Sequence, residues 1–247
     1  MKVKSILVSQ PEPKVENSPY FDLQQKYKIK IDFRPFIHIE GVSAKEIRQQ
    51  KIDLSHYDSI ILTSKNAVDH YFRVAEEMRF KVPETMKYFC QSEAIAYYLQ
   101  KYVVYRKRKI YVGQKEFADL TPLIKKFKDD KFLLPASDKL NDDVPQTLDK
   151  LGVEWKPGVF FITAMSDLSD LKDVKYDVLC FFSPTGINSL FKNFPDFVQN
   201  DTRIAVFGST TKKEAEENGL RIDIMAPTPE APSMTMALEK YIISVNK

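Results

Sequence analysis

Short apolar runs alternate with amphipathic stretches along almost the whole chain. The runs are rich in β-branched and aromatic residues, and the stretches between them repeat apolar positions with the helical period. This alternation is typical of a parallel β-sheet covered by helices on both faces. The predicted strands and extended segments are Ser5–Ser9, Lys30–Val42 with an interruption at Pro35, the run around Ile60, Tyr88–Cys90, Ile110–Val112, Phe132–Leu134, Val153–Ala164, Val178–Phe182, Ile204–Phe207 and Arg221–Met225. The predicted helices are Tyr20–Tyr27, Ala44–Gln50, the segment after Ser64, Glu93–Lys101, Ala118–Lys128, Val144–Leu151, the segment after Ser183, Lys212–Asn218 and Ser233–Ile243.

One unit of this pattern, a strand that stops at a serine and turns directly into a helix, occurs twice. Asp58–Phe72 aligns with Asp177–Phe191, which places Ser64 over Ser183. After each copy comes a second short apolar run that ends in small polar residues and opens a helix. The duplication predicts two related α/β domains within the 247 residues, with polar strand ends that are expected to face each other across a cleft.

The two copies are followed by unequal lengths of chain. The second copy reaches the C-terminus after only three predicted strands, so the N-terminal residues are needed to complete its sheet. We therefore predict an α/β fold of two similar parallel-sheet, three-layer domains joined by a two-stranded linker that acts as a hinge, with the first domain discontinuous. The predicted bounds are 1–34 with 166–247 for the discontinuous domain, 38–160 for the inserted domain, and 34–40 and 159–165 for the linker strands.

Small polar residues occupy five predicted strand-to-helix junctions. Unpaired backbone N–H groups and the helix dipole make a helix start a binding place for carboxylates. Serine, threonine and asparagine are also the preferred helix caps, so capping is the favoured interpretation of any single junction. Together, at the carboxyl ends of parallel strands, the five junctions point to an anion site. The candidate substrate-binding residues are Ser64, Lys65, Asn66, Gln91, Ser92, Ser137, Ser183, Pro184, Thr185, Gly186, Ser209, Thr210 and Thr211.

The charge balance and the lengths of the apolar runs exclude several classes of partner. A formal net charge of +3 is too small for a nucleic-acid footprint, although it is compatible with a small acidic ligand. The longest apolar run, Val178–Phe182, is far short of the roughly 20 residues that span a bilayer. The stretch Ile6–Val8 is likewise shorter than the roughly 7–15 apolar residues of a secretory signal. We expect a cytoplasmic monomer with no nucleic-acid or membrane partner.

Conventional catalytic and cofactor motifs are missing from the sequence. The histidines His38, His56 and His70 and the two cysteines lack metal-ligand spacing, and no glycine-rich phosphate loop or nucleophile elbow occurs. We expect neither metal nor cofactor, and we interpret His70 as a helix-surface or packed residue. Cys90 and Cys180 lie in apolar strands and are interpreted as buried free thiols of a reducing compartment.

Six segments match, in order and in spacing, the motifs of one known family. They are Ile6–Pro11, Pro35, Leu62–Val68, Phe181–Ile187, Val206–Thr211 and Pro227–Pro232. Each is weakly specific, but their succession along essentially the whole chain resembles the uroporphyrinogen-III synthase family. The resemblance implies a cofactor-independent lyase of tetrapyrrole biosynthesis. Such an enzyme closes the linear octacarboxylate hydroxymethylbilane into a macrocycle, inverting its ring D and losing water. It also implies two α/β domains joined by a two-stranded ladder.

Two positions depart from that family. Its frequent Thr-Arg pair after the first strand is Ser9-Gln10 in this chain. A linker-strand tyrosine, proposed as the acid that assists departure of the substrate hydroxyl, is replaced by Phe161, which cannot donate a proton. The resemblance implies that the substrate's own pyrrole nitrogen helps to expel this hydroxyl, so the protein supplies mainly geometry. Thr211 is the candidate catalytic residue.

Other interpretations remain open on the sequence alone. Tyr20, Tyr97 and Tyr98 are alternative proton donors, although packing within helices is the favoured interpretation of all three. The alternative to an enzyme is a non-catalytic two-domain protein that binds or senses tetrapyrroles or other anions. A protein-contact role for the same face is a third possibility. Conversion of hydroxymethylbilane to the type III isomer distinguishes the enzyme from the other two.

Overall fold

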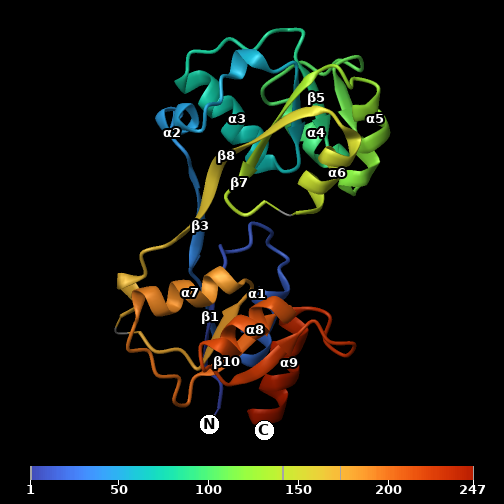
Figure 1. Ribbon diagram of the computed structural model, residues 1–247. Helices are drawn as coiled ribbons and strands as arrows, with labels where there is room; N and C mark the ends of the chain where they lie inside the picture. The colour runs from blue at the N-terminus through green and yellow to red at the C-terminus, as the bar shows by residue number, and fades with distance from the viewer. Residues whose placement is uncertain (1, 141, 173, 247) are drawn as a thin grey trace. The chain divides into compact units, whose positions relative to one another are not determined.

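The chain folds into two compact units, shown in the computed structural model of Figure 1. Unit 1 comprises Met1–His38 and Ala164–Lys247, and unit 2 comprises Ile39–Thr163. The chain passes between them twice, within strands β3 (Ile37–Gly41) and β8 (Glu154–Met165), which are neighbours in one sheet. The described residues are 2–140, 142–172 and 174–246.

Within the described residues, unit 1 contains a five-stranded parallel sheet in the order β11-β10-β9-β1-β2. The pairing of β1 with β9 means that the N-terminal segment completes the sheet of the C-terminal repeat, as the strand count predicted. The strands are β1 (Ser5–Val8), β2 (Lys30–Phe33), β9 (Val178–Phe181), β10 (Arg203–Phe207) and β11 (Ile222–Ala226). The helices are α1 (Pro19–Tyr27), the 3-10 turn η3 (Ser169–Leu171), α7 (Pro184–Asn193), α8 (Ser209–Glu217) and α9 (Met234–Val245).

Helices cover both faces of this sheet, because successive strand side chains point to opposite sides. Ile6 and Val8 of β1 pack into the core formed with α1 and α9, whereas Leu7 packs into the core formed with α7 and α8. All three are almost fully buried, and burial of one such side chain contributes about 1.5–3 kcal/mol. The strands are therefore apolar throughout, which explains their continuous apolar runs in the sequence.

Unit 2 contains a sheet whose described strands have the order β3-β8-β7-β4-β5-β6. Its remaining strands are β4 (Ser59–Leu62), β5 (Lys87–Cys90), β6 (Ile110–Val112) and β7 (Lys131–Ser137). Its helices are α2 (Ala44–Gln49), η1 (Leu54–His56), α3 (Lys65–Glu77), α4 (Glu93–Leu99), η2 (Phe117–Leu120), α5 (Thr121–Lys125) and α6 (Asp143–Leu151). Ile60 and Leu62 pack toward α3, whereas Ile61 joins the core beneath α5 and α6. The mixed α/β fold with parallel sheets between helical layers agrees with the prediction.

The extended segment Lys30–Val42 is interrupted at Pro35 as predicted and is divided there into β2 and β3, because proline has no N–H to donate to a sheet ladder. Two predicted helices differ from those in the structure. The helix predicted over Ala118–Lys128 consists of the 3-10 turn η2 followed by the short helix α5. Helix α8 begins at Ser209, three residues before the predicted start at Lys212.

Two predicted helix ends are confirmed by their backbone angles. Gly152 after α6 has φ 65°, and Gly219 after α8 has φ 74°. Glycine occupies this left-handed region without the steric penalty that a Cβ brings. Helices α6 and α8 therefore stop where the sequence places a glycine.

Candidate functional site

The strand order reverses once in each sheet, and open parallel sheets bind their ligands at such switch points. In unit 1 the reversal lies between β1 and β9, whose carboxyl ends lead into Ser9 and Ser183. In unit 2 it lies between β4, which leads toward Ser64, and β7, which ends at Ser137. The predicted polar junctions therefore lie along the ligand-binding edge of each sheet, considered by itself.

The start of α7 is a capped helix end. The Ser183 hydroxyl accepts a hydrogen bond from the Gly186 N–H at 3.1 Å, and Pro184 has no N–H at the first helical position. A Cβ placed on Gly186 would lie 3.5 Å from the Ser183 hydroxyl and 3.9 Å from the Ser9 hydroxyl, so both hydroxyls lie beside this first turn. The predicted cap is present, and it uses part of the donor capacity that an anion would need.

The start of α8 has a different character. Its N-cap is Gly208, which contributes no side chain, and its first three residues are Ser209, Thr210 and Thr211. The backbone N–H groups of these three residues have no hydrogen-bond partner among the described residues. The helix dipole adds roughly half a positive charge at this end. Three unpaired donors at a positive helix end suit a carboxylate.

Thr211 adds a hydroxyl to these donors. Its side chain is only 1% exposed, yet its hydroxyl makes no hydrogen bond to any described residue. Among the described residues, only the Tyr71 hydroxyl is both fully buried and without a partner, so the Thr211 hydroxyl keeps a small contact with solvent. Valine would fill the same space without a hydroxyl. Packing alone therefore does not explain a threonine at this position.

In unit 2, the start of α3 combines a cap with a cation. The Ser64 hydroxyl accepts a hydrogen bond from the Ala67 N–H at 3.0 Å, which confirms the predicted cap. The N–H groups of Lys65 and Asn66 have no partner among the described residues, and both side chains are exposed. The Lys65 ammonium lies 5.3 Å from the ring centre of Tyr98. This junction offers two amide donors and one positive charge.

The start of α4 is less suited to an anion. The Ser92 side chain makes no capping hydrogen bond, and Glu93 places a carboxylate in the first turn. The Gln91 amide nitrogen donates to the carbonyl oxygen of Lys115 at 3.1 Å. Repulsion by Glu93 weakens the field of this short helix at the position where a ligand carboxylate would bind.

The predicted strand-to-helix junction at Ser137 is a strand end separated from its helix, whose predicted start at Val144 is confirmed to within one residue. Strand β7 continues to Ser137, which pairs with Phe161 of β8, and α6 begins only at Asp143. The Ser137 hydroxyl accepts a hydrogen bond from the Lys139 N–H at 3.2 Å. The extra pairing with β8 extends the strand beyond the apolar run that the sequence shows, so Ser137 lies at a strand end without a helix start.

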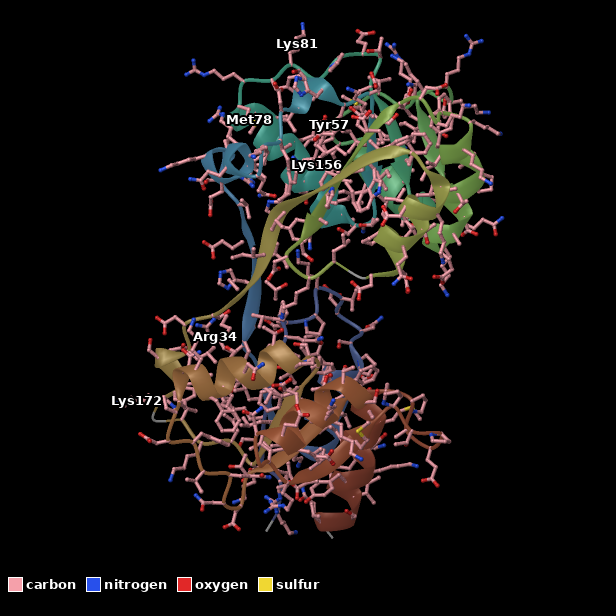
Figure 2. The ribbon with its side chains drawn as sticks, in the orientation of Figure 1. Arg34, Tyr57, Met78, Lys81, Lys156 and Lys172 are labelled. Carbon is pink, nitrogen blue, oxygen red and sulfur yellow. The ribbon has the colours of Figure 1, made fainter. Side chains whose placement is uncertain are left out.

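Arg34 is a cation at the carboxyl end of β2 that was not among the predicted binding residues. Arg34, labelled in Figure 2, follows β2 directly and makes two hydrogen bonds of 3.0 Å to the Asp170 carboxylate and one of 2.8 Å to the Asp167 carbonyl. These contacts hold the pKa of the Asp170 carboxyl below its usual range. Arg34 therefore pairs within unit 1, and its charge is largely compensated there.

Phe161 lies against His70, which was predicted to be a helix-surface or packed residue. Its ring stacks on the His70 imidazole of α3, with ring centres 5.2 Å apart and planes 22° apart. Arg73, one turn further along α3, donates to the imidazole Nδ1 at 3.1 Å. Partial burial, followed by the charge of Arg73, lowers the pKa of His70. The packed interpretation is confirmed, and the neutral imidazole is favoured.

The three tyrosines considered as alternative proton donors have separate settings. Tyr20 packs edge-on against Phe33, and burial raises its pKa above the usual range. Tyr98 donates to the carboxylate of Asp69 at 2.8 Å, and Tyr97 is 78% exposed. Burial makes Tyr20 a weaker acid and Tyr98 already has an acceptor, so packing is the better interpretation of these two.

Cys90 and Cys180 are buried free thiols, as predicted, and burial raises the pKa of Cys90 to about 12. Over the described ranges, no three His, Cys, Asp or Glu side chains converge as a metal site requires. No helix in the described part of the chain has the length and apolar character needed to cross a membrane.

Together these features define a class: a two-unit parallel α/β protein whose strand ends carry small polar residues and hydrogen-bond donors. The family model described as uroporphyrinogen-III synthase HemD matches residues 22–236. The chain therefore belongs to the uroporphyrinogen-III synthase family.

Individual relatives agree with this assignment. The chain is 24% identical to a uroporphyrinogen-III synthase of Chlorobaculum parvum, over 97% of this chain and all of that protein. It is 27% identical to the Saccharomyces cerevisiae uroporphyrinogen-III synthase over half of each chain.

Two solved structures show the same fold. The uroporphyrinogen-III synthetase of Helicobacter pylori has a TM-score of 0.59 at 17% identity, covering 98% of this chain and 99% of that one. A mutant uroporphyrinogen III synthase of Thermus thermophilus has a TM-score of 0.52 at 14% identity, with the same coverage.

Proposed function

We propose that this chain converts hydroxymethylbilane to uroporphyrinogen III. Family membership supports the reaction class, and the observation that carries the proposal is the start of α8. There, three N–H groups and the almost buried hydroxyl of Thr211 have no partner among the described residues. A substrate with eight carboxylates matches such a set of donors. Binding energy spent on these groups orients the reacting rings.

The proposed reaction requires control of geometry more than acid–base chemistry. The ring A pyrrole nitrogen pushes its electron pair toward the hydroxymethyl carbon, and the C–O bond breaks to release the hydroxyl, which leaves as water after protonation. The substituted carbon of ring D then attacks the resulting azafulvene and forms a spiro intermediate. Cleavage of the bond from this carbon to the ring C bridge, followed by closure at the other ring D position and loss of a proton, inverts the ring. The protein must favour this route over direct closure.

The described contacts rank the proposed binding residues. In unit 1, Ser209–Thr211 provide the principal carboxylate site, and Ser183–Gly186 flank it from the neighbouring strand end. In unit 2, Ser64–Asn66 provide two amide donors and a cation. Gln91 and Ser92 contribute less, because the Glu93 carboxylate opposes an anion there. Ser137 contributes at most its side chain, since no helix starts beside it.

We propose that no cofactor takes part and that no side-chain acid is essential. Expulsion of the hydroxyl by the substrate's own nitrogen needs no redox or electrophilic group. Phe161, at the position of the family's tyrosine, cannot donate a proton, which supports a mechanism that does not depend on one. We further propose a monomer acting in the cytoplasm, where buried free thiols such as Cys90 and Cys180 remain reduced.

The test is incubation of the purified chain with freshly prepared hydroxymethylbilane, followed by oxidation and chromatographic separation of the porphyrin isomers. Spontaneous closure gives the type I isomer, so a parallel incubation without protein sets the background. Predominant type III product supports the proposal. If only type I product forms while the chain binds uroporphyrin, the protein is a tetrapyrrole-binding or sensor protein, and the enzymatic proposal is wrong.

A further inference from the structure

His70 is held in one orientation by contacts on two sides. Its imidazole stacks on Phe161, with ring centres 5.2 Å apart. The Arg73 Nε–H donates to His70 Nδ1 at 3.1 Å. Because the guanidinium can only donate, Nδ1 must accept, and a neutral imidazole then carries its proton on Nε2. The contacts therefore select a single tautomer.

Arg73 is itself fixed by the backbone. It donates to the Val42 carbonyl at 2.6 Å and to the Phe160 carbonyl at 3.3 Å, and it pairs with the Glu77 carboxylate. A Cβ on Gly41 would approach the guanidinium carbon to 2.7 Å, so Arg73 occupies the space that glycine leaves. The guanidinium thus has little freedom to release the His70 nitrogen.

An irregularity in β8 places this cluster at the ligand-binding edge of unit 2. Ala136 pairs with Val159, but the next residue of β7, Ser137, pairs with Phe161, so Phe160 is an extra residue in the ladder. Phe160 and Phe161 consequently pack into the same core, although neighbouring residues of a regular strand face opposite sides. Phe161, and the imidazole stacked on it, therefore lie level with the last residue of β7.

The His70 Nε2–H has no acceptor among the described residues. The two ring nitrogens project outward on opposite sides of Cε1, so this N–H points away from the guanidinium. The charged groups around the ring are Arg73, which lowers the pKa of His70, and Asp69 and Glu77, which oppose that effect. A fixed N–H donor beside a cation favours an anionic acceptor.

We propose that His70 is a substrate-binding residue that donates a hydrogen bond from Nε2 to a carboxylate of the bound tetrapyrrole. The inference rests on the proposed function for the identity of the ligand, whereas the tautomer and the donor follow from unit 2 alone. The neutral ring contributes direction and not a proton, which fits a site whose neighbouring aromatic residue is Phe161.

Two substitutions separate the donor from the packing. His70→Phe keeps an aromatic ring against Phe161 but removes the N–H, and His70→Gln keeps an amide N–H at similar reach while losing the ring. A hydrogen bond to a charged acceptor corresponds to about a tenfold or larger change in affinity. We expect His70→Phe to raise KM about tenfold and to increase the type I fraction, with little change in kcat. His70→Gln should restore most of the affinity.

His56→Gln is the matched control, because His56 is an exposed histidine of the 3-10 turn η1, and its kinetics should equal those of the wild type. Normal KM and isomer ratio in His70→Phe would overturn the proposal. An equal rise in KM and an equal increase in type I product in His70→Phe and His70→Gln, with unchanged binding of uroporphyrin, would also overturn the proposal, because this result would indicate a packing role.

Nitrogen-15 NMR of the histidine side chains provides a readout that does not depend on turnover. The His70 signals should report the Nε2–H tautomer, and titration with uroporphyrin III, a stable octacarboxylate, should shift the Nε2 resonance while leaving that of His56 unchanged. If the wild-type chain forms no type III isomer but this shift occurs, the enzymatic proposal fails and the His70 contact stands. If type III isomer forms and the His70 resonances are unaffected by uroporphyrin III, the His70 inference fails.

Discussion

Substitution of Thr211 by valine separates the needs of the fold from those of the ligand. The side chain is 1% exposed and its hydroxyl has no partner among the described residues. Valine keeps the β-branched shape while removing the hydroxyl. We expect the free energy of unfolding to change by less than about 1 kcal/mol, because the hydroxyl keeps contact with solvent and makes no hydrogen bond that the fold would lose. The midpoint of thermal unfolding should then change by less than about 4 °C.

The same substitution should impair catalysis. Loss of one hydrogen bond to a carboxylate corresponds to about a tenfold fall in kcat/KM, with more type I product. Thr147→Val is the matched control, since Thr147 is a helical threonine of α6 whose hydroxyl donates to the Asp143 carbonyl at 2.7 Å. It should leave the isomer ratio unchanged. A Thr211→Val variant that is less stable than wild type and keeps the wild-type rate and isomer ratio would refute the reasoning, because the hydroxyl would then serve the fold.

Three further predictions concern stability. Gly208→Ala should lower the free energy of unfolding by about 1–3 kcal/mol, measured by urea denaturation, because φ +86° and ψ 153° are accessible almost only to glycine. Lys87→Met should lower the free energy of unfolding by about 1–3 kcal/mol, because it leaves the partly buried Asp130 carboxylate without the Lys87 ammonium, which lies 2.6 Å away. The double variant with Asp130→Asn should recover part of this loss of stability. Asp119 accepts backbone hydrogen bonds from residues 114–116, which lower its pKa. The ionised Asp119 therefore contributes its full share to the free energy of unfolding at any pH above the ordinary aspartate pKa of about 3.9. This contribution is lost as the pH falls through the lower pKa of the folded state. Asp119→Asn should be less stable than wild type at neutral pH and equally stable in strong acid, and a difference independent of pH would contradict this assignment.

Capping and anion binding compete for the same donors, and the structure separates them helix by helix. Ser64 and Ser183 act as caps, so their hydroxyls serve the helices that they open. Gly208 cannot cap with a side chain, and the N–H groups that follow it remain available within the described residues. The absence of a cap at α8 is thus more informative about ligand binding than the presence of serine at α7.

The sequence by itself determined the local elements of this protein. Apolar strand runs, the serine caps and the glycines at 152 and 219 act within a few residues, so their pattern predicted most strands and helices and the α/β class. The duplication and the strand count also predicted that the N-terminal segment joins the C-terminal repeat, because a sheet needs enough strands to bury both faces. The family's motifs were recognisable for the same reason, since each is a short local segment of a few residues at a strand end or in a loop.

Only the tertiary structure decided which polar groups remain without partners. Ser137 lies at a strand end because β8 pairs with it, and Thr211 is buried although the sequence places it among the small polar residues of a strand-to-helix junction. The extra residue Phe160 in β8 turns Phe161 toward His70, and Arg73 then fixes the imidazole tautomer. These outcomes depend on contacts between residues far apart in the chain, and no local pattern of hydrophobic and polar positions records such contacts.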